Sequence, residues 1–317
     1  MRIVMMGTGG YAVPTFEALL ESSHDVAALV TKALPSGKRP PPNPMRTVAE
    51  ARGVPILDPV DVNDPAAHPS LVALQPELFV VCDYGRILSP QVLALAPHGG
   101  INLHASLLPK YRGAAPINWA LYHGETVTGN TVLHMTPRVD GGPCVAQNRV
   151  DIGPEENAVE LEQRLARLGA PLVLQVVEAI AAGHLEPIEQ DRASVTRAPR
   201  LKKSDGDIDW TRTAEQIFNQ IRALKPWPGT FTHWHREGAE PLRLSVPAAQ
   251  VVSGEAISGT AGAAPGQILE VGERLLVATG DGVLALVELQ PAGKRVLSTA
   301  EFLNGYRVQA GDRFGPA

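Results

Sequence analysis

Residues 2–10 read RIVMMGTGG, and this stretch already favours one class of fold. The apolar run Arg2–Met6 ends in a glycine-rich turn, Gly7–Gly10, and a helical stretch, Val13–Leu20, follows. A strand that leads through such a turn into a helix is typical of an α/β sheet. The opening of the chain therefore predicts the first strand and helix of such a sheet.

The rest of the first half repeats this alternation. Apolar runs rich in Val, Ile and Leu alternate with helical stretches, as in a mostly parallel sheet covered on both faces. The further strands are expected at 26–31, 54–57, 78–82, 101–105, 131–135 and 144–150. The further helices are expected at 45–51, 70–74, 89–95, 155–168 and 171–182, with a short one from Pro116 to just before Gly124. We predict a Rossmann-like, doubly wound domain over residues 1–189.

The second half has a different pattern. The polar stretch 190–206 is interpreted as a linker, and one helix is expected at 214–225, ended by PWPG at 226–229. Short strands with turn residues between them are expected at 230–234, 242–246, 267–271, 275–278 and 283–289. This pattern predicts a small OB-like β-barrel over residues 207–317.

Composition excludes several classes of protein. A chain of 317 residues corresponds to about two domains. Its 33 acidic against 28 basic residues give a net charge of −5, which argues against nonspecific coating of nucleic acid. Two cysteines exclude a disulfide scaffold, and no apolar run is long enough for a membrane span. No secretory signal is recognisable, so we expect a cytoplasmic protein. We also expect a monomer.

The glycine turn allows a second interpretation. Gly7, Gly9 and Ala12 match the spacing of the dinucleotide-binding fingerprint. That fingerprint also needs an acidic residue at the end of the second strand, and the segment Leu29–Lys32 has none. We therefore interpret the glycines as a tight turn and do not predict an NAD(P) site.

The expected strand 101–105 carries the first candidate catalytic residues. Alternation along a strand places Asn102 and His104 on one face, at the sheet edge where open α/β sheets bind ligands. An amide and an imidazole there can donate to an oxyanion, and the imidazole can move a proton. A histidine satisfied by the backbone is the alternative. Asp140 could reach the same edge and orient His104, although Asp-Gly is also a common turn pair.

These residues belong to a longer pattern. Residues 102–117 read NLHASLLPKYRGAAPI and resemble the signature of the 10-formyltetrahydrofolate-dependent formyltransferases. Asp140 stands where that family carries its catalytic aspartate. Further similarities follow in order to the end of the chain, among them PWP at 226–228, ATGDG at 278–282 and LQPAGK at 289–294.

The resemblance implies a Rossmann-like catalytic domain joined to an OB-like, tRNA-binding domain. The reaction would move the formyl group of 10-formyltetrahydrofolate to the amino group of methionine on initiator methionyl-tRNA, without a metal ion. The implied residues are Asn102, His104 and Asp140 for catalysis, and Ser106, Leu107, Leu108 and Pro109 for folate binding.

Two basic groups are candidates for tRNA contact. Lys38 and Arg39 lie in a short, proline-rich loop, 33–44, which resembles a clamp on the acceptor stem of tRNA. Arg200, Lys202 and Lys203 lie in the expected linker, which has the densest positive charge. Residues 207–317 hold ten basic against twelve acidic residues, a net of −2, so we expect a local basic strip.

Two positions depart from the family pattern. Gly141 follows Asp140 where a threonine is usual, and Asp83 adds a charge before Tyr84 where small apolar residues are usual. A formyltransferase or hydrolase acting on a nucleotide sugar, or on the folate itself, is the alternative enzyme. A folate- or nucleotide-binding module without catalysis is the alternative from another class.

The remaining candidates have ordinary explanations. His233 and His235 have the spacing of metal ligands, but a half-exposed strand is the simpler interpretation. Three tryptophans could stack on bases or pack in the core or linker, and packing is the preferred interpretation; they are Trp210, Trp227 and Trp234. Cys82 and Cys144 are expected to be buried thiols.

Overall fold

The computed structural model describes residues 1–33, 43–252 and 262–316. Backbone proximity divides the chain into two compact units. Unit 1 comprises 1–117, 127–152 and 160–199, and unit 2 comprises 118–126, 153–159 and 200–317.

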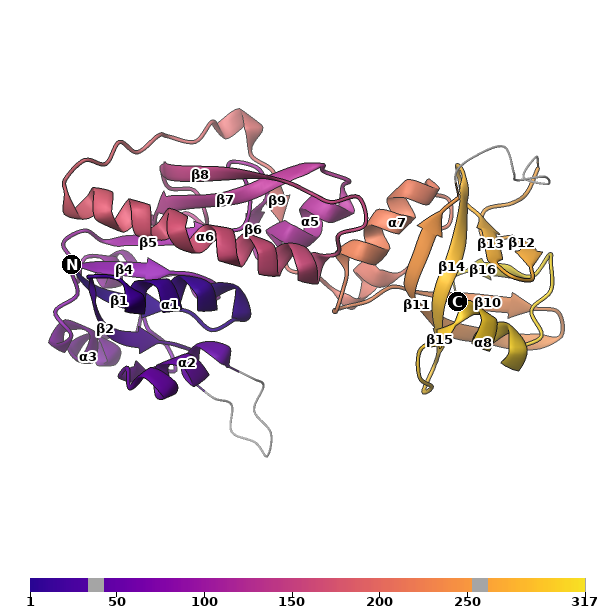
Figure 1. The fold of residues 1–317 in the computed structure, drawn as a ribbon, viewed down its shortest axis with the longest axis horizontal. Helices are drawn as coiled ribbons and strands as arrows, with labels where there is room; N and C mark the ends of the chain where they lie inside the picture. The colour runs from indigo at the N-terminus through magenta and orange to yellow at the C-terminus, as the bar shows by residue number, and fades with distance from the viewer. Residues whose placement is uncertain (34–42, 253–261, 317) are drawn as a thin grey trace. The chain divides into compact units, whose positions relative to one another are not determined.

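Unit 1 is built on a seven-stranded sheet with the order β3-β2-β1-β4-β5-β7-β8 (Figure 1). The strands are β1 (Arg2–Met6), β2 (Asp25–Val30), β3 (Ile56–Leu57), β4 (Leu78–Val81), β5 (Gly100–His104), β7 (Val127–His134) and β8 (Cys144–Asp151). The pairs β3–β2, β2–β1, β1–β4 and β4–β5 are parallel, whereas β5–β7 and β7–β8 are antiparallel. The predicted Rossmann-like, mostly parallel sheet is confirmed.

Helices accompany the sheet as its alternating pattern requires. They are α1 (Val13–Glu21), α2 (Pro44–Arg52), α3 (His68–Ala73), α4 (Pro90–Leu93) and α6 (Ala158–Ala181), with 3-10 turns η1 (Gly10–Ala12) and η2 (Pro65–Ala67). Helix α5 (Pro116–Tyr122) belongs mostly to unit 2. The antiparallel strands β7 and β8, of eight residues each, are longer than the sheet's other strands.

The expectation of two helices at 155–168 and 171–182 is wrong, because α6 continues through Pro171. A proline inside a helix removes one hydrogen bond and costs about 3 kcal/mol. The apolar stripe of α6 runs on both sides of it, with Leu161, Leu165, Val173 and Val176 all buried. Burial contributes about 1.5–3 kcal/mol for each such side chain, so packing outweighs the break.

The glycine turn after β1 is filled by the protein itself. A Cβ on Gly7 would lie 2.8 Å from the carbonyl oxygen of Cys82, and a Cβ on Gly9 would overlap the carboxylate of Asp83. The backbone N–H of Thr8 donates to the Asp83 carbonyl at 3.1 Å. The glycines are thus required for close approach of β1 and β4, which supports the tight-turn interpretation.

Unit 2 is a nearly closed antiparallel barrel of order β12-β13-β14-β11-β10-β16, with β15 paired to β14. Its strands are β10 (Phe231–Arg236), β11 (Ala239–Val251), β12 (Ile268–Val271), β13 (Leu275–Ala278), β14 (Val283–Pro291), β15 (Leu297–Ser298) and β16 (Arg313–Gly315). The two edge strands meet where the Ile268 N–H donates to the Asp312 carbonyl at 2.8 Å. The predicted small barrel is confirmed.

The barrel closes around an aromatic core. Trp210 stacks on Phe314, and Trp234 packs against Phe302. Helix α7 (Ala214–Ala223) begins at a capping box made by Thr213 and Gln216. Helix α8 (Thr299–Gly305) was not predicted, although Ser298 and Glu301 form the same kind of capping box at its start.

Candidate active site

Strand β5 places Asn102 and His104 on the same face of the sheet of unit 1. Leu103 points to the other face, where a Cβ on Gly169 of α6 would lie 2.6 Å from the Leu103 Cδ2 atom. His104 is buried and Asn102 is half-buried. Among the described residues, the Asn102 side chain has no hydrogen-bond partner, so its amide is available to a ligand.

The His104 ring is held by two neighbours. Its Nε2 atom donates to the Tyr111 carbonyl at 2.9 Å. Its Nδ1 atom lies 3.7 Å from the Asp140 Oδ2 atom. Because a carbonyl oxygen can only accept, the proton of the neutral ring belongs on Nε2, and Nδ1 is left as the nitrogen that can take up a proton.

Asp140 occupies a strained turn between β7 and β8. Its φ is 47°, in the left-handed region, and its Oδ2 atom accepts from the Gly113 N–H at 2.8 Å. Gly142 leaves no room for a side chain, because a Cβ there would overlap the His134 carbonyl. The turn thus brings the carboxylate to His104, and the three predicted catalytic residues lie at one edge of the sheet.

Residues 111–113, which contact His104 and Asp140, are held in place by the segment that follows α6. Strand β6 (Arg112–Gly113) pairs in parallel with β9 (Arg197–Ala198). The Tyr111 N–H donates to Thr196 Oγ1 at 2.8 Å. The 3-10 turn η3 (Arg192–Ser194) precedes β9. Thr196, Arg197 and Ala198 therefore hold the 111–113 loop in place, although their sequence resembles a linker.

Gln190 is a residue of the site that the sequence did not reveal. Its side chain bonds to the Asp140 and Gly142 carbonyls and to the Arg112 guanidinium. It lies in a polar stretch with no periodicity, and its partners are far away in sequence. No pattern in the sequence could have indicated it.

The segment 106–109 lies directly after β5. Ser106 and Leu108 are buried, and the Ser106 hydroxyl donates to the Lys110 carbonyl at 2.7 Å. The Leu108 N–H donates to Thr131 Oγ1 at 3.1 Å, and Gln147 donates to the Leu108 carbonyl at 2.9 Å. Leu107 and Pro109 are partly exposed. The folate-binding role of this segment stays a prediction.

Asp83 follows β4 at the same edge of the sheet, with a φ of 46°. Desolvation raises the pKa of its carboxyl group from 3.8 to about 6, and the Lys32 ammonium partly offsets this rise. The same carboxylate helps to raise the pKa of Glu162. Asp83 is solvent-exposed.

The candidate tRNA contacts are only partly visible. Lys38 and Arg39 lie outside the described residues. Arg200, Lys202 and Lys203 are exposed in unit 2, just before and at the start of η4 (Lys203–Gly206). Their role in tRNA binding stays a prediction.

The other candidates have structural explanations. Trp210 and Trp234 belong to the barrel core, whereas Trp227 is 49% exposed. Cys82 is buried and Cys144 is half-buried, and burial raises the pKa of both thiols, so neither is an activated thiolate. Within the described ranges, no group of three or more His, Cys, Asp or Glu side chains is placed to hold a metal ion. No helix in the part of the chain described is both long and apolar enough to cross a membrane.

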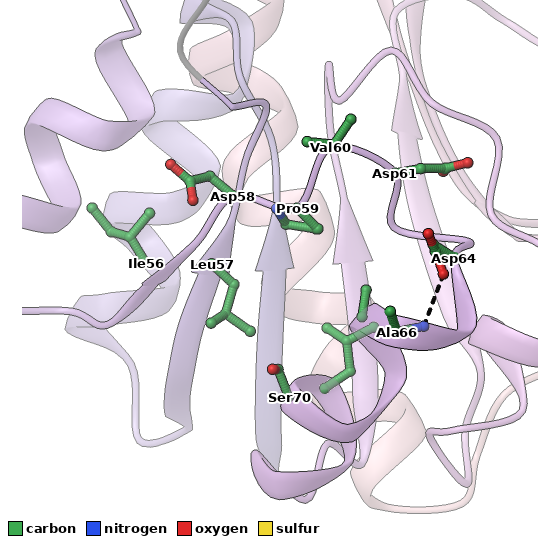
Figure 2. Close-up of a pocket in the computed structure, with 11 residues that line it drawn as sticks. Ile56, Leu57, Asp58, Pro59, Val60, Asp61, Asp64, Ala66 and Ser70 are labelled. Atoms are coloured by element: carbon green, nitrogen blue, oxygen red, sulfur yellow. Dashed lines mark hydrogen bonds between the residues drawn. The ribbon is translucent and has the colours of Figure 1, made fainter.

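A hollow of about 380 Å³ lies between the end of β3 and α3. Figure 2 shows the residues that line it. Its aspartates serve local structure: Asp58 pairs with Arg46 at 2.5 Å, and Asp64 accepts from the Ala66 N–H at 2.9 Å. Asn102, His104 and Asp140 do not line it. The hollow is therefore separate from the site at the end of β5.

Comparisons with known proteins cover nearly the whole chain. The family model described as formyl transferase matches residues 1–177, and that of the formyl transferase C-terminal domain matches residues 200–307. A methionyl-tRNA formyltransferase of Rhodopirellula baltica is 41% identical, over 99% of this chain and 96% of that protein. One of Geobacter sulfurreducens is 40% identical, over 100% of this chain and 98% of that protein.

Solved structures share the fold. An N-formyltransferase of Helicobacter canadensis, in complex with folinic acid and dTDP-3-aminofucose, matches with a TM-score of 0.66 and 16% identity, over 90% of this chain and 98% of that one. HypX of Aquifex aeolicus, in complex with tetrahydrofolic acid, matches with a TM-score of 0.61 and 18% identity, over 96% of this chain and 47% of that one.

Proposed function

Because the chain belongs to the formyl transferase family, we propose that it formylates the methionine carried by initiator tRNA. The donor is 10-formyltetrahydrofolate, and the product is formylmethionyl-tRNA for the initiation of translation. The observation that carries this proposal is about 40% identity with methionyl-tRNA formyltransferases over the whole chain, barrel included.

The residues at the end of β5 suit this chemistry. The free amine of methionine attacks the formyl carbon, the new C–N bond forms, and the formyl oxygen gains negative charge. Asn102 donates its amide N–H to that oxygen, since the side chain has no other described partner. Collapse breaks the bond between the carbon and N10 of the folate, and the proton lost by the amine ends on N10.

His104 and Asp140 serve the proton movements of this reaction. With Nε2 bonded to Tyr111, the Nδ1 atom of His104 is the position that can hold a proton beside Asp140. The carboxylate keeps the ring in place. Ser106, Leu107, Leu108 and Pro109 supply the backbone beside which the folate binds in this proposal.

The chain is mapped onto this function by domain. Residues 1–189 carry the catalysis, and residues 190–206 connect the domains and also supply Gln190 to the site. Residues 207–317 bind tRNA through the basic strip of Arg200, Lys202 and Lys203 at their margin. A monomer in the cytoplasm is sufficient for this scheme.

The test incubates the purified protein with 10-formyltetrahydrofolate and charged initiator tRNA and measures formylmethionine after release from the tRNA. Formylmethionyl-tRNA is expected, and charged elongator tRNA is the matched control. Product only with an amino sugar nucleotide, or only hydrolysis of the folate, would replace this proposal with the alternative enzyme.

A further inference from the structure

The side chain of Gln190 uses its full hydrogen-bonding capacity inside the candidate active site. Its Nε2 atom donates to the Asp140 carbonyl at 2.8 Å and to the Gly142 carbonyl at 2.7 Å. Its Oε1 atom accepts from Arg112 Nε at 3.1 Å and from Arg112 Nη2 at 2.7 Å. An amide offers two N–H donors and one oxygen with two lone pairs, so nothing is left unsatisfied.

The surroundings also determine which way the amide points. Both carbonyls can only accept, and the guanidinium can only donate. A flipped amide would set its oxygen against two carbonyl oxygens and its NH₂ against an arginine. One orientation is therefore possible, and it locks the turn of Asp140 to Arg112.

This lock closes a ring of contacts around His104. Arg112 is followed by Gly113, whose N–H donates to the Asp140 carboxylate, and preceded by Tyr111, whose carbonyl accepts from His104. Gln190 ties the same segment to the backbone of Asp140. The Asp140 carboxylate and the His104 ring are thus both held by residues 111–113.

The turn needs such a lock. Asp140 has a φ of 47°, which L side chains rarely adopt, and two glycines follow it. The glycines allow the chain many other conformations. The two bonds from Gln190 select the one that keeps Asp140 Oδ2 at 3.7 Å from His104 Nδ1.

We propose that Gln190 is a positioning residue of the formyl-transfer reaction, which holds the Asp140 carboxylate at His104 through the 140–142 turn. The inference rests on the proposed function for its reaction, and on the hydrogen bonds alone for its geometry. Gln190 lies between the segments matched by the two family models.

The first test is kinetic. Gln190→Ala should lower kcat at least about tenfold while the KM for tRNA changes less than about twofold, because a displacement of about 1 Å in a reacting group can cost about 100-fold. Gln190→Glu should not restore activity, since its carboxylate keeps Arg112 but repels the two carbonyls. Asp191→Asn is the matched control in the same segment and should keep wild-type kcat, because among the described residues the Asp191 carboxylate accepts only from the Ala193 N–H and the Ser194 hydroxyl.

A double variant separates positioning from general stability. In an Asp140→Ala background there is no carboxylate to position, so adding Gln190→Ala should lower kcat by less than about twofold. The proposal would be overturned if the double variant lost kcat by the product of the two single losses. Wild-type kcat in Gln190→Ala would also overturn it.

The second test does not depend on the substrate. The ring NMR signals of His104, assigned by their loss in His104→Ala, should move in Gln190→Ala and stay in place in Asp191→Asn. Unmoved signals in Gln190→Ala would overturn the proposal even if formyl transfer is confirmed. If the wild-type protein makes no formylmethionyl-tRNA but the signals move, the proposed function fails and the positioning role of Gln190 stands.

Discussion

At the scale of single residues, two asparagines on neighbouring strands have opposite surroundings. Asn102 on β5 is half-buried, with no described partner for its side chain. Asn130 on β7 is fully buried; its Oδ1 atom accepts from the Tyr11 hydroxyl at 2.5 Å and its Nδ2 atom donates to the Leu165 carbonyl at 2.9 Å. The first is free for chemistry, and the second supports the packing of α6 on the sheet.

This contrast gives the first prediction. Asn102→Ala should lower kcat at least about tenfold, a cautious limit below the 10²–10³ typical of one lost oxyanion donor, and leave the melting temperature nearly unchanged. Asn130→Ala should do the reverse, because it leaves buried groups unpaired at about 1–3 kcal/mol. Single-turnover rates and thermal unfolding measure the two effects. Near wild-type turnover in Asn102→Ala would remove Asn102 from the mechanism.

The second prediction concerns Asp83. Its pKa of about 6 lies above the ordinary 3.8, so between these pH values the folded protein retains a proton that the unfolded chain has lost. The free energy of unfolding therefore falls as the pH rises through this window. Asp83→Asn removes the charge and should raise the melting temperature at pH 8 more than at pH 5.

The control for Asp83 has the opposite sign. Hydrogen bonds from Ser194 and Ala193 lower the pKa of Asp191, so its charged form stabilises the folded protein above the ordinary pKa. Asp191→Asn should therefore lower the melting temperature at pH 8. An equal gain for Asp83→Asn at both pH values would contradict the desolvation of its carboxylate.

At the scale of elements, the turn between β1 and α1 allows a third prediction. A Cβ on Gly7 would lie 2.8 Å from the Cys82 carbonyl oxygen and 3.0 Å from Met45 Cε. Gly7→Ala must push β1 and β4 apart and should cost about 1–3 kcal/mol, as overpacking does. The change in free energy of unfolding can be measured with denaturant.

Gly10 provides the matched control three residues later. A Cβ there meets no described atom within 4 Å, and its φ is not in the left-handed region. Gly10→Ala should be neutral or stabilise by about 0.4–1 kcal/mol through the unfolded state. If both variants were equally destabilised, the glycines would serve flexibility of the turn and not the contact with β4.

The elements also explain what the sequence could and could not predict. Asn102 and His104 were found because a strand places alternate residues on one face, a rule that needs no tertiary information. Helix α6 was divided in error at Pro171, because burial on both sides overrides a local breaker. Strand β9 and Gln190 were missed because their partners, β6 and the 140–142 turn, are distant in sequence.

At the scale of the whole molecule, the distribution of charge bears on where tRNA can bind. The chain carries −5, and residues 207–317 contribute −2, so tRNA must bind at local positive groups. Arg200, Lys202 and Lys203 are exposed, and they take part in none of the ion pairs found among the described residues. Exposed cations without ion-pair partners can displace counterions from nucleic-acid phosphates, and no salt bridge within the protein has to break first.

The fourth prediction follows from this. Reversing Arg200, Lys202 and Lys203 to Glu should raise the KM for tRNA about tenfold or more at 0.15 M salt and leave kcat within about twofold. The salt dependence should also weaken, since each lost phosphate contact removes about 0.7–0.9 from the slope of log K against log salt. The control reverses three exposed cations of unit 1, Arg52, Arg149 and Arg167, which changes the net charge equally. If both triple variants raised KM alike, net charge would govern binding, and an unchanged KM in the first would make the strip an ordinary solvated segment.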